Sequence, residues 1–183
     1  NNIKSSSDDR FCHHKVICLH IIQKFIPINT YLELGVHNGA SMSYVVNFDT
    51  KKHCFGIDLF NENYIKNYDK DRLSLNRSLN NIQKNNKNSE IVLIKGNTNS
   101  DSTLQQFIES YKDKLKKTDI GIDLLFIDAD HNYKPLLNDL NTYTKYLKRN
   151  GILVVDDFPT GGNGGTKKAL DEFLRNNDFR IIG

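Results

Sequence analysis

Two short apolar runs constrain the fold most: IDLLFID at residues 122–128 and GILVVDD at residues 151–157, each ending in acidic residues. The segment between them carries apolar residues at helical spacing: Tyr133, Leu136, Leu137, Leu140, Tyr143 and Leu147. This pattern predicts a strand, a helix and a second strand. A crossover of this length favours parallel neighbouring strands, so both acidic ends would open on one carboxyl edge, where open α/β folds bind ligands.

Three carboxylates are expected at that edge, on Asp128, Asp156 and Asp157. Neighbouring strands lie about 4.8 Å apart, so these side chains can converge on one small volume. Carboxylates so close repel one another unless a cation lies between them, and oxygen ligands favour Mg²⁺ or another hard divalent ion such as Mn²⁺ over zinc. Each acid alone has an alternative role as a cap or turn acceptor. With His131 at the mouth of the same edge, the convergence favours a functional site.

Composition excludes several classes of protein. A chain of 183 residues suits one domain with a buried core. The net charge of +3 comes from scattered Lys and Arg, which argues against a nucleic-acid partner. No apolar run approaches a membrane span and no cleavable signal is visible, so we expect a cytoplasmic protein without a membrane partner. Cys12, Cys18 and Cys54 form no CxxC pair, which predicts free, buried thiols in a reducing compartment.

The remaining segments continue the alternation of helices and strands. Residues 1–9 form a polar tail, and because the chain starts at Asn1 without methionine, we expect a processed product or a piece of a longer protein. The predicted helices cover residues 10–26, a segment around Leu75 to Ile82, and a segment starting near Ser102; the predicted strands cover 30–35, 54–60, 90–95 and a strand start at 179–182. Residues 10–183 therefore form one α/β domain with a mostly parallel, doubly wound, Rossmann-like sheet and helices on both faces.

Two further segments resemble ligand-binding elements. In ELGVHNGAS, Gly35 and Gly39 allow a sharp turn after a strand and keep side chains away from a ligand, and the following helix N-terminus can accept a carboxylate or phosphate. His37 stands where the dinucleotide fingerprint needs glycine. Asp58 ends the next strand and can accept hydrogen bonds from both ribose hydroxyls, although it can equally cap the following loop.

Two loops complete the predicted site. The polar loop GNTNSDS after the third strand suits hydrogen bonding to a base edge. The segment FPTGGNGGTKK fits no P-loop register, and its glycines predict a mobile flap beside the acidic site.

In order and spacing, ELGxxxGxS, the acid of the second strand, IDADH and VVDD resemble the class I S-adenosylmethionine-dependent methyltransferases over about residues 30 to 180. Within that class the chain is similar to the metal-dependent O-methyltransferases of the catechol type, and most of all to the branch acting on sugar hydroxyls of macrolide antibiotics. Those catechol-type enzymes usually carry Asn at the place of Asp157 and Lys at the place of His131. The Asp pair with His is the pattern of the sugar branch.

The resemblance implies a set of site residues. S-adenosylmethionine would be the cofactor, with its ribose on Asp58 and its adenine near Asn97 or Thr98. Its methionine part would be bound by residues of the first strand and turn: Glu33, Gly35, His37, Gly39 and Ser41, with Asp128 close by. Mg²⁺, or another hard divalent cation such as Mn²⁺, would be held by Asp128, Asp156 and Asp157. Asp128 and His131 would be the catalytic residues.

The implied reaction is an in-line methyl transfer to a hydroxyl of a sugar, glycan or other small molecule. The metal would lower the pKa of that hydroxyl, and His131 would take its proton. The family fold ends in a hairpin of strands six and seven, whereas this chain stops inside strand six. The oligomeric state and any further domains of a longer chain stay open. A catalytically silent cofactor-binding domain of a glycan-modifying protein is the main alternative, and the absent GxGxxG disfavours a nicotinamide-dependent oxidoreductase.

Overall fold

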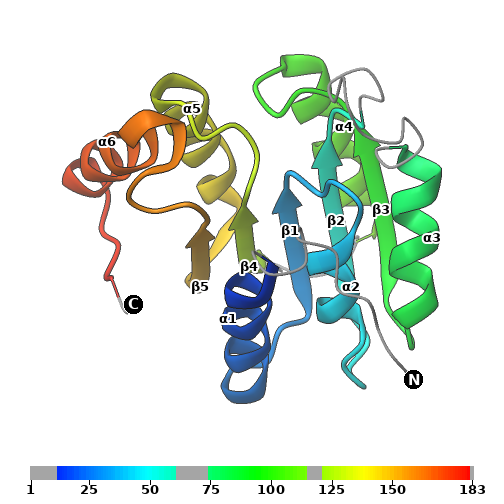
Figure 1. Cartoon of the computed structure of the whole chain (residues 1–183). Helices are drawn as coiled ribbons and strands as arrows, with labels where there is room; N and C mark the ends of the chain where they lie inside the picture. Colours follow the sequence, from blue (N-terminus) through cyan, green and yellow to red (C-terminus); the bar gives the residue numbers. More distant parts are fainter. Residues whose placement is uncertain (1–11, 61–73, 115–120, 182–183) are drawn as a thin grey trace, which may run out of the picture.

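The computed structural model describes residues 12–60, 74–114 and 121–181, with only the backbone described at 12–13. Helices and strands alternate along the chain (Figure 1). In chain order they are α1 (Cys12–Phe25), β1 (Thr30–Leu34), α2 (Ala40–Val46), β2 (His53–Asp58), α3 (Leu75–Asn85), β3 (Glu90–Lys95), α4 (Asp101–Lys114), β4 (Ile122–Ile127), α5 (Tyr133–Tyr143), the 3-10 turn η3 (Thr144–Tyr146), β5 (Leu147–Val155) and α6 (Gly161–Asn176).

The five strands form one parallel sheet in the order β3-β2-β1-β4-β5. Strand order therefore reverses between β1 and β4, and a reversal of this kind marks the ligand edge of a doubly wound sheet. The register keeps the strand ends level, because Leu34 lies beside both Ile57 and Ile127, and Ile127 lies beside Val155. The predicted Rossmann-like fold class is confirmed, and the acids that follow β4 and β5 lie on neighbouring strands.

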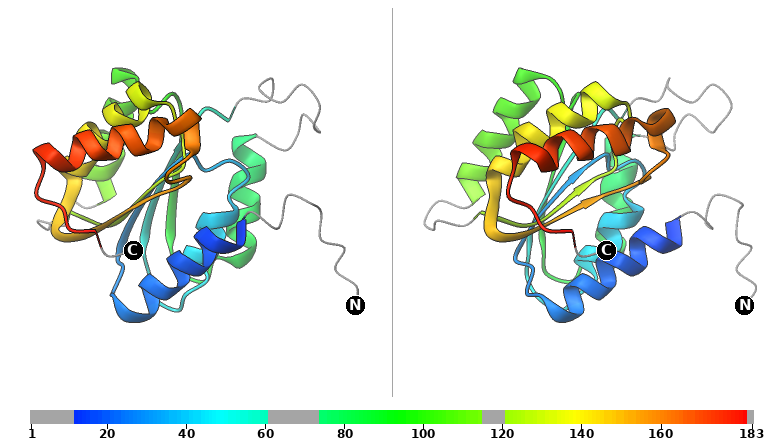
Figure 2. Two further views of the ribbon diagram at one scale, coloured as in Figure 1. Left: turned by 60° about the vertical axis from the view of Figure 1, so that its left-hand side comes forward. Right: turned by 90° about the vertical axis from the view of Figure 1, so that its left-hand side faces the viewer.

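Helices cover both faces of the sheet (Figure 2). One apolar core joins α1, α2 and α3 to the sheet through residues such as Leu19, Val45 and Ile82. The other core joins α4, α5 and α6 to the opposite face, with Phe107 and Phe173 at 0% and 1% exposure. Because alternate side chains of a strand point to opposite faces, strands covered on both sides must be apolar throughout, which explains the continuous runs seen in the sequence.

Asp123 fixes the amino edge of the sheet near β4. Its Oδ2 accepts hydrogen bonds from the backbone N–H groups of Asn29 and Thr30, at 2.8 and 2.9 Å. Its Oδ1 pairs with the ammonium of Lys148 in β5. One carboxylate therefore aligns the start of β1 with β4 and β5, which helps to level the strand ends at the opposite, functional edge.

Two expectations differ from the structure. Of the strand start predicted at 179–182, residues 179–181 form no strand, and residue 182 lies outside the described residues. The ring centroids of Phe179 and Phe173 are 5.1 Å apart, which keeps this segment beside α6. The thiols also differ from one another, because Cys54 is buried, with its pKa raised by burial to about 12, whereas Cys18 on α1 is exposed. The polar tail at 1–9 lies outside the described residues. No helix in the described ranges is long and apolar enough to span a membrane.

Candidate active site

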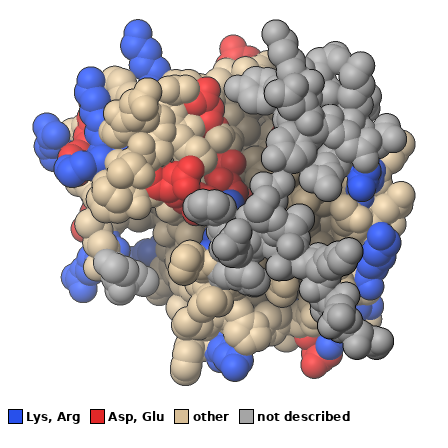
Figure 3. All heavy atoms as spheres, viewed as in Figure 1, with Lys and Arg blue, Asp and Glu red and all other residues tan. Residues whose placement is uncertain are grey.

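Asp128 and Asp156 lie side by side just past the ends of β4 and β5. The backbone N–H of Asp128 donates to the carbonyl of Leu34 at 2.8 Å, and that of Asp156 donates to the carbonyl of Ile127 at 3.0 Å, so both residues are fixed to the sheet. Between the two carboxylates lies Lys15 of α1. Its Nζ is 2.5 Å from Asp128 Oδ2 and 2.8 Å from Asp156 Oδ2. Acidic side chains gather near the middle of this face of the molecule, beside basic atoms (Figure 3).

Burial and neighbouring charges shift the pKa values of the three ionisable groups in different directions. Burial raises the pKa of Asp128 to about 7, with the repulsion of Asp156 adding to it and Lys15 opposing it. Burial also acts to raise the pKa of Asp156, but its hydrogen bonds with Lys15 and Asp128 outweigh burial and lower it. Burial would lower the pKa of Lys15, yet the two carboxylates reverse the direction and raise it. The lysine is therefore the charged centre of the cluster.

His131 lies next to this pair and faces two carboxylates. Its Nδ1 is 3.4 Å from Asp157 Oδ2, and its Nε2 is 3.6 Å from Asp128 Oδ1. The Nε2 atom is buried and has no hydrogen-bond partner among the described residues. The imidazole therefore lies between two carboxylates, and the nitrogen that faces Asp128 is the one left without a hydrogen-bond partner in the described ranges.

The predicted metal ligands do not form a ready metal centre. Among the described residues no group of three His, Cys, Asp or Glu side chains is placed to hold a metal ion. Lys15 lies between Asp128 and Asp156, and Asp157, with a left-handed backbone at φ 56°, contacts His131 instead. The sequence predicted a hard divalent cation among the three acids; in the structure an ammonium group of the chain itself lies between Asp128 and Asp156.

A glycine-rich turn holds the segment that carries His131. The N–H of Gly161 donates to the carbonyl of Asp157 at 2.8 Å, and Gly162 has φ 58°. A Cβ on Gly162 would lie 2.0 Å from the carbonyl oxygen of His131, and one on Gly165 would lie 2.6 Å from the same atom. Two glycines of the predicted flap, Gly162 and Gly165, are therefore packed against the β4–α5 loop, because only residues without a Cβ allow so close an approach.

The glycines after β1 also serve close packing within the chain. Gly35 has φ 88°, and a Cβ there would lie 2.1 Å from the carbonyl oxygen of Asp128. Gly39 has φ 82°, and a Cβ there would lie 2.7 Å from Ile82 of α3. The prediction that these glycines keep side chains away from a ligand missed this role: they let the turn approach β4 and α3.

Glu33 is fully buried near the end of β1, and two other side chains donate hydrogen bonds to its carboxylate. Tyr31 donates a hydrogen bond to Oε2 at 2.9 Å, and Ser41 donates to Oε1. Burial raises the pKa of Glu33 to about 8, although both hydrogen bonds oppose this shift. The hydroxyl of Ser41 is thus engaged with Glu33, and the predicted roles of both residues toward a cofactor's methionine part stay predictions.

Asp58 lies at the carboxyl end of β2, beside the turn that follows β1. Its Oδ2 accepts from the backbone N–H of His37 at 2.8 Å, and its Oδ1 accepts from the N–H of Phe60 at 2.7 Å. Both partners have left-handed backbones, with φ 51° at His37 and 43° at Phe60. Asp58 therefore caps two strained loops, and each carboxylate oxygen keeps a lone pair for a further donor.

The loop after β3 is tied to α5 by a residue that the sequence did not single out. Asp139 is fully buried; it accepts from Thr98 Oγ1 at 3.0 Å and from Asn99 Nδ2 at 2.8 Å. The hydroxyl of Tyr143 donates to the carbonyl of Thr98 at 2.9 Å. Asn97 is exposed, whereas Thr98 is engaged inside the protein. One sequence feature could have identified Asp139: it is an acid on the apolar face of a predicted helix.

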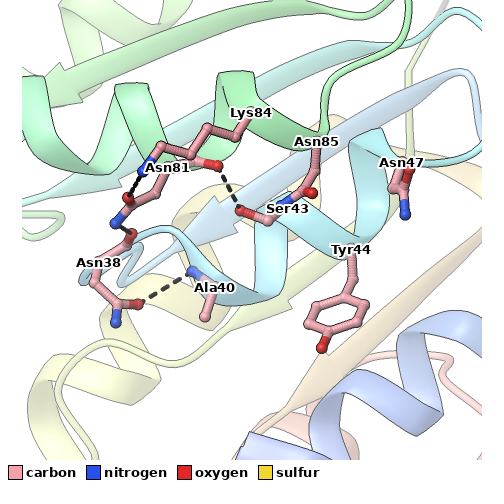
Figure 4. A pocket seen from close by; sticks show the side chains of 8 residues that line it. All are labelled: Asn38, Ala40, Ser43, Tyr44, Asn47, Asn81, Lys84 and Asn85. Atoms are coloured by element: carbon pink, nitrogen blue, oxygen red, sulfur yellow. Dashed lines mark hydrogen bonds between the residues drawn. The ribbon is translucent and has the colours of Figure 1, made fainter. Parts of the chain in front are cut away.

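A separate hollow of about 370 Å³ lies between α2 and α3 (Figure 4). The residues that line it are Asn38, Ala40, Ser43, Tyr44, Asn47, Asn81, Lys84 and Asn85. Several of their polar groups bind one another; Asn81 Nδ2, for example, donates to the carbonyl of Asn38 at 3.1 Å. None of the lining residues belongs to the acidic cluster, so this hollow is distinct from the candidate active site.

Comparison with known proteins decides the family. The methyltransferase domain family matches residues 32–158, which run from β1 through both acidic strand ends. This chain belongs to that family. The methyltransferase domain is also 31% identical over 130 residues to the uncharacterized protein R132 of Acanthamoeba polyphaga mimivirus; the match covers 70% of this chain and 51% of R132. The chain thus spans about half the length of this relative.

Solved structures share the fold of this methyltransferase domain. CalS11, a TDP-rhamnose 3'-O-methyltransferase of calicheamicin biosynthesis, has a TM-score of 0.62 at 15% identity, covering 99% of this chain and 84% of CalS11. TomG, an O-methyltransferase from Streptomyces achromogenes solved with S-adenosylmethionine, has a TM-score of 0.56 at 13% identity, covering 90% and 69%. An O-methyltransferase from Bacillus cereus, solved with S-adenosylhomocysteine, has a TM-score of 0.51 at 13% identity, covering 90% and 68%.

Proposed function

We propose that this domain transfers a methyl group from S-adenosylmethionine to a hydroxyl oxygen of a sugar, glycan or other small molecule. The observation that carries the proposal is the buried, unpartnered Nε2 of His131, which lies beside Asp128 at the ligand edge of a methyltransferase-family sheet. An unpaired imidazole nitrogen at that place is suited to receive the proton that a hydroxyl loses as it is methylated. The fold shared with a TDP-rhamnose O-methyltransferase supports a sugar hydroxyl as the acceptor.

The residues at the edge fit the proposed cofactor. S-adenosylmethionine supplies an electrophilic methyl group on a positively charged sulfur. Asp58 would hold the ribose, since each of its oxygens has one backbone donor and one lone pair left. The turn from Gly35 to Gly39 would hold the methionine part, and the loop at Asn97 and Thr98 would lie near the adenine. TomG and the Bacillus cereus enzyme, which share the fold and were solved with S-adenosylmethionine and S-adenosylhomocysteine, support the choice of cofactor.

Side chains of the protein itself can receive the proton that the acceptor hydroxyl loses on methylation. Asp157 lies 3.4 Å from His131 Nδ1 and favours a proton on that nitrogen. Nε2, 3.6 Å from Asp128 Oδ1, is then the nitrogen proposed to receive the proton, and the glycines packed against the His131 carbonyl hold the backbone that carries the imidazole. Holding the acceptor hydroxyl between Nε2 and the methyl donor would supply part of the rate enhancement through positioning alone.

Whether the proposed methyl transfer depends on a divalent metal is a separate hypothesis. Asp128, Asp156 and Asp157 are the residues that would hold Mg²⁺ or Mn²⁺, and carboxylate oxygens are the ligands such hard cations prefer. Lys15 occupies the space between two of them, however, so the arrangement does not fit a bound metal as it stands. We therefore assign no step of the reaction to a metal.

A mass-spectrometric screen tests the proposed function. The protein is incubated with S-adenosylmethionine and a panel of sugar and catechol acceptors, in parallel reactions containing Mg²⁺ or excess EDTA. We expect a product heavier by one methyl group and loss of that product in the His131→Gln variant. Cofactor binding without turnover on any acceptor would favour the silent cofactor-binding domain. Binding of NADH with none of S-adenosylmethionine would favour the oxidoreductase.

A further inference from the structure

Lys15 reaches the acidic pair because α1 is fixed against the sheet. Leu19 lies one helical turn after Lys15, is fully buried, and packs in the core that contains Leu124 and Phe126 of β4. Residues four apart lie on the same helix face, so burying Leu19 turns Lys15 toward β4 as well. In contrast, Ile17 and Ile21 on the other side of α1 are 54% and 50% exposed.

The ammonium lies where a bridging metal would have to lie. Its distances of 2.5 Å to Asp128 Oδ2 and 2.8 Å to Asp156 Oδ2 leave no room for a second cation between those oxygens. Mg²⁺ binds carboxylate oxygens at about 2.0–2.1 Å and would overlap Nζ. Binding of Lys15 and binding of a metal that bridges these two oxygens are therefore mutually exclusive.

We infer that Lys15 is an internal counter-cation, which occupies the Asp128–Asp156 pair in place of a divalent ion and competes with any metal for it. The inference concerns the proposed active site but does not require methyl transfer. The side chains of all three residues are largely covered, with 21%, 17% and 23% exposed for Lys15, Asp128 and Asp156. Two adjacent, covered carboxylates need a cation, and the ammonium provides one without a metal.

The competition is measured by titrating the cofactor-free protein with MnCl₂ and recording free Mn²⁺ by electron paramagnetic resonance. Lys15→Met removes the charge and keeps an unbranched apolar side chain. We expect this variant to bind Mn²⁺ at least ten times more tightly than the parent, and the double variant Lys15→Met, Asp128→Asn to lose that gain. Lys24→Met is the matched control, since Lys24 is an exposed lysine in the last turn of the same helix. It should bind Mn²⁺ as the parent does.

Equal Mn²⁺ affinity in the parent and Lys15→Met, whether tight or undetectable in both, would overturn the inference. If Lys15→Met does not fold by itself, the melting temperature with and without MnCl₂ supplies the measurement. Mn²⁺ should then restore or raise the melting transition of the variant and leave that of the parent unchanged; equal behaviour contradicts the competition. Neither measurement uses an acceptor or a methyl donor, so failure of the proposed methyl transfer would be seen separately.

Discussion

At the scale of single residues, the candidate site depends on carboxylates with different tasks. Asp156 and Asp128 share the ammonium of Lys15, whereas Asp157 contacts the imidazole of His131. Lys15 contacts Oδ2 of Asp128, and Nε2 of His131 lies 3.6 Å from Oδ1 of the same carboxylate with no hydrogen-bond partner in the described part of the chain. An unpaired buried polar atom is costly, so its presence in an otherwise satisfied cluster points to a ligand that completes it.

Replacing His131 with glutamine separates proton transfer from shape. Glutamine keeps much of the size and hydrogen bonding of histidine but cannot accept the hydroxyl proton, so we expect turnover to fall about 10²- to 10⁴-fold. Cofactor affinity should change little. Steady-state rates of the two proteins with an acceptor found in the screen, and calorimetry with S-adenosylmethionine, make the comparison. A variant as fast as the parent would make His131 a structural residue.

Asp58 offers a second test at this scale, through the cofactor. Asp58→Asn keeps the shape of the side chain but removes the charged acceptor from the ribose hydroxyls. Hydrogen bonds to charged groups contribute about 1.5–3 kcal/mol, so the dissociation constant of S-adenosylmethionine should rise by roughly one to two powers of ten. Calorimetry on both proteins measures the difference. Unchanged affinity would leave Asp58 only as the cap of the His37 and Phe60 loops.

At the scale of elements, two segments far from one another in sequence complete the site: α1, which carries Lys15, and the glycine-rich turn at the start of α6, which packs against His131. The start of α5 is also bound to α6, because Tyr133 donates a hydrogen bond to Glu172 Oε2 at 2.5 Å and Lys168 Nζ lies 4.1 Å from the Tyr133 ring centroid. The loop between β4 and α5 is therefore held at its carboxyl end by α6 and at its amino end by the sheet.

Two glycines of this turn make a matched pair. Gly162 and Gly164 both have positive φ, 58° and 86°, so alanine strains the backbone at either position. Only at Gly162 would the new Cβ also meet the His131 carbonyl, at 2.0 Å, while at Gly164 nothing lies within 4 Å. We expect Gly162→Ala to lower turnover by at least an order of magnitude more than Gly164→Ala, with similar cofactor affinity in both. Equal losses would show that the contact with His131 does not matter.

The elements also show what the sequence could predict. The strands with their acidic ends, the helix between them and the parallel sheet follow from apolar periodicity, because strands covered on both faces leave continuous apolar runs. The sequence did not predict the role of Lys15. Helical periodicity identifies which apolar residues of α1 are buried, but it does not show what a polar residue on the same helix face contacts. The packed glycine turn was read as a flap, since glycine permits both mobility and close approach.

At the scale of the whole molecule, a strand and a helix each carry a buried acid that affects stability: Glu33 in β1 and Asp139 in α5. Glu33 lies at the end of β1, and Asp139 joins α5 to the loop after β3 on the opposite face. Burial raises the pKa of Glu33 to about 8 and that of Asp139 to about 7. Both carboxyl groups therefore hold their protons in the folded chain at pH values where an unfolded chain has released them.

This difference predicts that the contribution of these two acids to stability falls as pH rises. A raised carboxyl pKa means that the folded chain binds more protons than the unfolded chain between the unfolded pKa, about 4, and the folded one, so unfolding becomes easier across that window. Asp139 should contribute about 1.4 kcal/mol of lost stability for each pH unit between roughly 4 and 7.

The variant Asp139→Asn tests this contribution. Asparagine cannot ionise and can still receive a hydrogen bond, so the variant removes the contribution of Asp139 while Glu33 continues to act in both proteins. Urea unfolding at pH 5, 6 and 7 should show the parent losing stability more steeply than Asp139→Asn. Parallel pH profiles for the two proteins would mean that Asp139 is already ionised in the folded chain, held by Thr98 and Asn99 as a carboxylate.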